Sequence, residues 1–237
     1  MVFMNYYALS ALLITAPISN HLLTDETTSP TYFNTEEGQN LLLGSNHRCD
    51  FWHLIQYYDT QKTYAHCSVA SSVMVLNALD IEKPKEEKYR CYSLFTQDNF
   101  FTDKVKAVVD PEDVARRGMS VDEITKSLNS FDTVKAGAFY TSDLSVDKFR
   151  DLLKTTLRDK STFIIVNYLR TAIGQTGGGH FSPVGAYNEK EDKVLILDVS
   201  RYRYAPAWVK TETLYKAMGV IEGDDSSPRG FVMVSKH

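Results

Sequence analysis

Residues 64 to 79 read Y-A-H-C-S-V-A-S-S-V-M-V-L-N-A-L, and apolar residues recur from Val69 to Leu79 at the spacing of a buried helix face. Cys67 stands where a short polar approach becomes this helical pattern. A thiol in the first turn of a helix lies against the positive end of the helix dipole, which favours thiolate over thiol. A small apolar core residue would suit the same place, so this stretch alone leaves both interpretations open.

The segments around this stretch predict an α+β fold, because helical patterns dominate the first half and antiparallel strands follow later. Ser120 and Glu123 form a capping-box pattern at the start of one helix. The expected helices are residues 35–43, 50–58, 67–79, 111–117, 120–128, 145–158 and 211–218, and the expected strands are residues 162–169, 181–187, 193–199 and 230–235.

Composition excludes several functional classes. The chain is 43% hydrophobic and 24% charged, which is typical of a packed protein and not of a disordered one. Its net charge of −4, without a basic tract, argues against a nucleic-acid partner. It has no Cys-x-x-Cys pair, so a zinc ribbon or thioredoxin-type site has no support. The sequence does not decide whether Cys49 and Cys91 form a disulfide.

The N-terminal residues allow two interpretations. Residues 1–18 are mostly apolar and lack Asp, Glu, Lys and Arg, as in a packed helix or an export signal. The protein is exported, to the periplasm or outside the cell, if Met1 to about Ser19 is a signal, and cytoplasmic otherwise. We expect no stable membrane span, because polar residues interrupt this stretch. We therefore expect residues 1–28 to be a separate segment with a linker, and residues 29–237 to be the catalytic domain.

A thiolate nucleophile needs a base and a group that orients the base. Of six histidines, His180 has the most distinctive setting, G-Q-T-G-G-G-H-F-S-P-V-G, where glycines give close backbone access before a strand. Asp198 interrupts the apolar run of the next strand, and a buried carboxylate needs a partner. A structural histidine and a strand-end carboxylate are the alternatives.

The connection between these two strands decides whether His180 and Asp198 meet. A five-residue connection pairs Tyr187 with Lys193, so that Ser182 faces Asp198 and His180 lies diagonally across on the same face. A four-residue connection would put His180 and Asp198 on opposite faces. The hairpin therefore permits a His–Asp pair without proving it.

Two further patterns carry weaker signals. Gln61, six residues before Cys67, can offer a side-chain amide to an oxyanion beside the Cys67 backbone N–H, although a surface amide is the simpler interpretation. His47-x-Cys49-x-x-x-His53 has the residue types of a metal cluster, but the segment is rich in aromatic residues. We therefore expect no metal site in the protein.

Taken together, these segments resemble the phytochelatin synthase family of the papain-like cysteine peptidase superfamily, from about Ser29 to Lys236. The resemblance is carried by Q-K-T-Y-A-H-C-S-V-A-S-S-V-M-V-L-N-A-L, G-G-G-H-F-S-P-V-G-A-Y, L-I-L-D-V-S-R-Y-R-Y and R-G-F, in family order. It implies a papain-like fold in which a helical N-terminal half carries the nucleophile and the C-terminal half forms the antiparallel sheet. The resemblance does not decide whether the protein forms a homodimer.

The resemblance also implies chemistry on glutathione. Cys67, His180, Asp198 and Gln61 would be catalytic, cleaving the Cys-Gly bond through a γ-glutamylcysteinyl thioester that water or a second glutathione then resolves. The positions expected to contact substrate are Arg229, Arg201, Gly179 and Ser68. Deglycination would need no cofactor, and a heavy-metal ion such as cadmium or zinc would enter as a metal-glutathione thiolate.

Departures from the family pattern affect the second step most. Ser68 stands where the family usually has glycine, Tyr64 stands where it has proline, and the adjacent cysteine pair and cysteine-rich C-terminal domain of plant members are missing. The sequence resembles the short bacterial-type form. Two alternatives remain: a papain-like peptidase acting on other peptides, and an inactive thiol- or metal-binding module.

Overall fold

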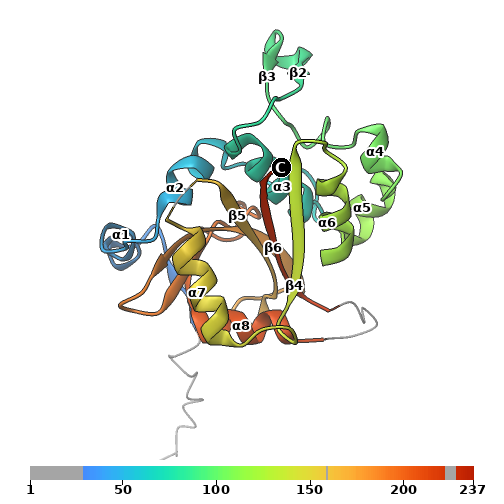
Figure 1. Ribbon diagram of the computed structural model, residues 1–237. Coiled ribbons are helices and arrows are strands. Elements are labelled where there is room, and N and C mark those ends of the chain that lie inside the picture. Colours follow the sequence, from blue (N-terminus) through green and yellow to red (C-terminus); the bar gives the residue numbers. More distant parts are fainter. Residues whose placement is uncertain (1–28, 159, 222–227) are drawn as a thin grey trace, which may run out of the picture.

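The computed structural model describes residues 29–158, 160–221 and 228–237, and its central feature is a seven-stranded sheet with strand order β1-β8-β7-β6-β5-β9-β4 (Figure 1). Every neighbouring pair in this sheet is antiparallel. The mixture of helices with an antiparallel sheet confirms the expected α+β class.

The sheet strands are β1 (Thr31–Tyr32), β4 (Val134–Tyr140), β5 (Thr162–Leu169), β6 (Gly179–Asn188), β7 (Lys193–Ile196), β8 (Ala207–Lys210) and β9 (Gly230–Lys236). A separate hairpin, which projects at the top of Figure 1, consists of β2 (Lys85–Glu86) and β3 (Tyr92–Ser93). The α-helices are α1 (Glu36–Leu43), α2 (Cys49–Leu54), α3 (Cys67–Ala78), α4 (Asp103–Lys106), α5 (Pro111–Arg117), α6 (Val121–Asn129), α7 (Val146–Thr156) and α8 (Thr211–Gly219). Short 3-10 turns are η1 (Ile55–Tyr57), η2 (Glu87–Tyr89) and η3 (Thr171–Ile173).

Two apolar cores lie on the two faces of the sheet. Strand β5 shows why: its residues are buried on both faces, and alternate side chains enter different cores, Phe163 and Ile165 on one side, Ile164 and Val166 on the other. The first core contains α2, α3 and α6, and the second contains α7 and α8. Helix α3 has eleven buried residues, so it is a central helix and not an amphipathic surface helix.

Local sequence signals placed most helix starts correctly. The Ser120–Glu123 capping box is present in full at α6, and Thr35 and Ser145 cap α1 and α7 with their side chains. The expected helix over residues 50–58 breaks into α2 and the turn η1. Strands β1, β4 and β8 of the sheet, the β2–β3 hairpin and helix α4 were not expected, and β7 ends at Ile196 instead of Val199.

The connection between β6 and β7 differs from the five-residue arrangement that favoured a His–Asp pair. Asn188 pairs with Lys193, which leaves only four residues in the turn. That register alone would direct His180 and Asp198 to opposite faces. A β-bulge between Val184 and Ala186 shifts the register by one residue and restores the shared face.

Gly185 lies at this bulge, where an added Cβ would stand 3.2–3.3 Å from the Leu197 side chain. The expected N-terminal segment, residues 1–28, lies outside the described residues, and so does the possible export signal within it. Among the helices that the structure describes, none is long and apolar enough to cross a membrane. Within the same residues, no disulfide joins the three cysteines.

Candidate active site

The nucleophile candidate lies at the start of α3, as the sequence predicted. Cys67 is the first residue of this helix and is 8% exposed. The His180 imidazole and the backbone N–H groups of Ser68 and Phe181 act electrostatically on its thiol. The thiol therefore faces an imidazole and two backbone donors, which is the environment of a thiolate and not of an inert core cysteine.

His180 and Asp198 meet across the β6–β7 hairpin. His180 Nε2 lies 2.8 Å from Asp198 Oδ1, and both residues are buried. Because an ionised carboxylate only accepts hydrogen bonds, Nε2 carries the proton, and Nδ1 is the nitrogen that remains for Cys67. The three side chains thus lie in one row, from thiol to imidazole to carboxylate, and the imidazole is hydrogen-bonded to the carboxylate.

Asp198 is fully buried and is held by several donors. Arg170, directly after β5, donates through Nη1 to Oδ2 at 2.7 Å and through Nη2 to Oδ1 at 2.9 Å. The backbone N–H of Ser200 donates to Oδ1 at 2.8 Å. Tyr58 Oη donates to the Asp198 backbone carbonyl at 2.5 Å. Both carboxylate oxygens of this aspartate therefore have partners, as a buried charge requires.

The charges shift the pKa values in the directions that nucleophilic catalysis needs. Burial raises the pKa of the Cys67 thiol, but the charge and hydrogen bond of His180 and the two backbone donors outweigh it, so the net pKa is lowered. Burial lowers the pKa of His180, but Cys67 and Asp198 outweigh it, so the net pKa is raised. Burial raises the pKa of Asp198, and His180 and Arg170 bring it well below its usual range. The arrangement favours a thiolate–imidazolium pair.

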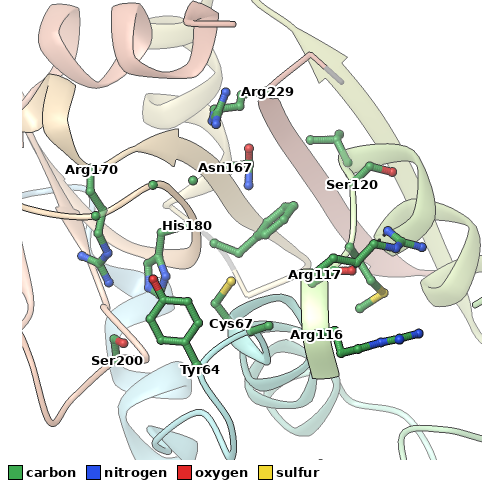
Figure 2. A pocket seen from close by; sticks show the side chains of 18 of the residues that line it. Tyr64, Cys67, Arg116, Arg117, Ser120, Asn167, Arg170, His180, Ser200 and Arg229 are labelled. Atoms are coloured by element: carbon green, nitrogen blue, oxygen red, sulfur yellow. Dashed lines mark hydrogen bonds between the residues drawn. The ribbon is translucent and has the colours of Figure 1, made fainter. Parts of the chain in front are cut away.

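A pocket of about 250 Å³ opens above the thiol and the imidazole (Figure 2). Figure 2 shows Cys67 and His180 at its centre, with Arg229 and Asn167 on one side and the end of α5 on another. No Asp or Glu is among the described lining residues. The guanidinium groups around the pocket belong to Arg116, Arg117, Arg170, Arg203 and Arg229. Such a lining suits a substrate with carboxylates.

Arg229 is a strong ligand candidate within this pocket. It is 8% exposed, its Nη1 donates to the Val220 carbonyl at 2.8 Å, and its buried Nε has no hydrogen-bond partner in the described part of the chain. An added Cβ at Gly179 would stand 3.2 Å from both Nε and Nη2 of Arg229. Gly179 therefore lets this guanidinium lie close against the strand that carries His180.

Two other sequence-predicted residues are not brought to the pocket. Gln61 Nε2 donates to the carbonyls of Thr63 and Tyr64 at 2.9 and 2.7 Å, and these two acceptors fix its orientation. Arg201 stacks on the Tyr58 ring at 4.6 Å and donates to the Tyr58 carbonyl. The Gln61 donors are therefore engaged by the loop before α3, and Arg201 lies on the surface.

Ser68 is fully buried and does not line the pocket. Its hydroxyl has no hydrogen-bond partner among the described residues, and it faces the interior of the protein. The substrate contact that we expected from Ser68 is therefore limited to its backbone N–H, which already lies against the Cys67 sulfur.

Sequence reasoning missed Arg170 and Asn167. Both lie at the pocket and both are less than 10% exposed. Their signal was present, because Asn167 interrupts the apolar run of β5 and Arg170 ends it. A polar residue inside a buried strand needs a partner, so these positions could have been marked as site candidates.

The weak metal pattern near α2 does not form a site within the described residues, where no cluster of His, Cys, Asp and Glu could hold a metal ion. His47 instead lies 3.1 Å from Glu189 and pairs by backbone with Tyr187.

The fold and the site define an α+β protein in which a thiol, an imidazole and a carboxylate form a buried row beside an arginine-lined pocket. A model of the family described as phytochelatin synthase matches residues 23–231. The chain belongs to this family.

Named relatives agree with the family. Glutathione gamma-glutamylcysteinyltransferase 3 of Lotus japonicus is 33% identical over 208 residues, which cover 86% of this chain and 42% of the relative. Glutathione gamma-glutamylcysteinyltransferase 1 of Arabidopsis thaliana is 34% identical over 78% of this chain and 37% of its own length. A Schizosaccharomyces pombe relative, glutathione gamma-glutamylcysteinyltransferase, is 29% identical over 78% of this chain and 43% of its own length. The chain thus spans less than half the length of these relatives.

Proposed function

We propose that this protein is a glutathione γ-glutamylcysteinyltransferase that works through a thioester on Cys67. The observation that carries the proposal is the buried Cys67–His180–Asp198 row under a pocket lined by arginines. The names of the relatives support glutathione, a peptide with two carboxylates, as the substrate.

The first half-reaction is deglycination. The Cys67 thiolate attacks the carbonyl carbon of the Cys-Gly bond, and the electron pair moves to the carbonyl oxygen. The Cys67 backbone N–H, at the positive end of α3, stabilises this oxyanion. When the carbon–nitrogen bond breaks, His180 gives its Nδ1 proton to the glycine amine. Free glycine leaves, and a γ-glutamylcysteinyl thioester remains.

We do not assign the role of oxyanion donor to Gln61 in this scheme, because its side-chain amide donates to carbonyls of its own loop. It would reach the oxyanion only if its amide released the carbonyls of Thr63 and Tyr64. The role that the family resemblance implies for Gln61 therefore stays a prediction.

The second half-reaction resolves the thioester. Neutral His180 takes a proton from water or from the amine of a second glutathione, and that nucleophile attacks the thioester carbon. Water yields γ-glutamylcysteine, and glutathione yields a phytochelatin. The Cys67 thiolate and the imidazolium are regenerated in both cases. A cadmium or zinc ion takes part as a metal-glutathione thiolate, which is a form of the substrate.

Substrate binding follows from the charges at the pocket. Arg229 offers an unpartnered Nε beside Gly179 and is suited to a carboxylate of the acyl group. Arg201 lies on the surface, so we assign it no contact in the donor pocket. The packing of α3 against β6 of an antiparallel sheet supports the papain-like fold that the family resemblance implies. A homodimer stays a prediction.

The test is incubation with glutathione, with and without cadmium, followed by mass spectrometry of the products and with Cys67→Ala as the matched variant. γ-Glutamylcysteine and glycine that disappear in the variant establish the hydrolase. Phytochelatin that disappears in the variant establishes the transferase. Absence of every one of these products would reject glutathione as the substrate and favour a peptidase acting on other peptides.

A further inference from the structure

Arg170 is positioned more tightly than a residue that only lines a pocket needs to be. It is 3% exposed, Gln175 Oε1 accepts from its Nη1, and the Tyr204 ring lies 4.9 Å from its guanidinium carbon. An added Cβ at Gly177 would stand 3.1 Å from Arg170 Cδ. These contacts hold the guanidinium fork in one orientation.

The fork is the one partner, among the described residues, that binds both oxygens of Asp198. His180 and the Ser200 backbone N–H contact Oδ1 alone, whereas Arg170 donates to Oδ1 and Oδ2. A bidentate pair fixes the plane of a carboxylate, and a single hydrogen bond does not. The direction of the Asp198–His180 hydrogen bond therefore depends on Arg170.

The charges around Asp198 and His180 balance only when Arg170 is counted. Thiolate, imidazolium, carboxylate and guanidinium sum to zero inside the protein. The other titratable groups that face Asp198 are Tyr58 after η1, Tyr168 on β5 and Tyr32 on β1, and each has a raised pKa, chiefly through burial, so each is neutral. The remaining charged groups at the pocket are Arg116, Arg117, Arg203 and Arg229.

We propose that Arg170 is a positioning residue that fixes the Asp198 carboxylate against His180 and supplies the positive charge that keeps the buried thiolate–imidazolium–carboxylate row neutral. This inference deepens the proposed function and rests on it, because it concerns the same site. It does not require glutathione to be the substrate.

The two contributions of Arg170, charge and geometry, are separated by two variants. Arg170→Met removes the charge next to Asp198 and leaves the Cys67–His180–Asp198 row with a net charge of −1, so protons are held more tightly. The pH at which Cys67 becomes a thiolate then rises by about one unit, so alkylation of Cys67 below that pH is about tenfold slower. Arg170→Lys keeps the charge but loses the fork. The pH at which Cys67 becomes a thiolate therefore stays the same, and the deglycination kcat falls because Asp198 is no longer held in one orientation.

The experiment is the rate at which iodoacetamide alkylates Cys67 between pH 5 and 9, read by mass spectrometry of the Cys67 peptide, together with deglycination kinetics. Arg203→Met is the matched control for the alkylation profile, because Arg203 lines the same pocket and contacts Thr176 instead of Asp198. We expect the upward shift in Arg170→Met alone. Circular dichroism first establishes that each variant is folded.

An unchanged alkylation profile in folded Arg170→Met, or an equal shift in Arg203→Met, would overturn the proposal. Failure of both Arg170 variants to fold would also overturn it, in favour of a purely structural role. If glutathione is not cleaved by the wild-type protein but the alkylation profile shifts as expected, the proposed substrate is wrong and the positioning role stands.

Discussion

A substitution at Gly179 tests whether Arg229 binds substrate, without touching Arg229 itself. The Cβ of Gly179→Ala would stand 3.2 Å from Nε and Nη2 of Arg229, which is closer than an ordinary contact. The guanidinium must retreat by a few tenths of an ångström, and its Nη1 bond to the Val220 carbonyl limits where it can go. Gly178→Ala is the matched control, because a Cβ there meets nothing within 4 Å.

The expected effect is moderate. A hydrogen bond to a charged group contributes about 1.5–3 kcal/mol, and a small displacement weakens this bond without abolishing it. A loss of roughly 1 kcal/mol corresponds to about a fivefold rise in KM for glutathione. The thiol and the imidazole are not displaced, so kcat and the alkylation of Cys67 stay close to wild type.

The assay is steady-state release of glycine over a range of glutathione concentrations, for the wild type and both alanine variants. We expect KM to rise in Gly179→Ala and to stay near the wild-type value in Gly178→Ala. Equal changes in the two variants would show that the loop backbone, and not the Arg229 contact, is responsible. No change in either would remove Arg229 from the substrate site.

Three other substitutions probe buried or charged contacts. Asp198→Asn leaves two buried cations without their carboxylate, so we expect the free energy of unfolding, measured by urea titration, to fall by about 3–5 kcal/mol. We also expect slower alkylation of Cys67 at pH 7, because the His180 imidazolium is less stable without the carboxylate. Hydrogen bonding to Arg117 lowers the pKa of Glu123 to about 2. The ionised Glu123 therefore stabilises the fold above the unfolded pKa of about 4.3, and this stabilisation is lost as the pH falls through the folded pKa. Glu123→Gln should lower the melting temperature at pH 7 and make little difference near pH 2. Trp208→Phe leaves the Gly38 carbonyl without its 2.9 Å donor, and we expect a loss of about 1–3 kcal/mol in a urea titration; an unchanged midpoint would show that water replaces the indole.

Much of the fold was predictable because its signals are local. The α3 pattern, the Ser120–Glu123 capping box and the apolar run of β5 each follow from residues close in sequence. Strand β4 was missed because most of its residues are only half-buried, so the alternation that marks a strand is weak. The pairing of β6 with β7 could not be derived from turn length, because the bulge at Gly185 changes the register within the strand.

The residues of the site were likewise predictable where their signals are local and were missed where they depend on distant partners. Cys67, His180 and Asp198 were found because each stands out in its own segment, and the structure brings them together. Arg170 was missed because its partner Asp198 lies 28 residues away, beyond two further strands. Gln61 was placed by its distance in sequence from Cys67, but sequence distance does not fix where an amide points, and two loop carbonyls take its donors.

The glycines before His180 acquire a physical reason that the sequence did not suggest. Backbone access to the histidine was the expectation, yet two of the three make room for arginine side chains: Gly177 for the Arg170 Cδ and the Arg203 guanidinium, and Gly179 for the Arg229 guanidinium. Gly177 also has a φ of +122°, where a side chain would be strained. One arginine can orient the carboxylate, and another can bind the substrate close by, only if the backbone beside them carries no side chain. Gly177 and Gly179 are therefore required by the arginines around His180 and not by the histidine itself, whereas a Cβ at Gly178 meets nothing within 4 Å.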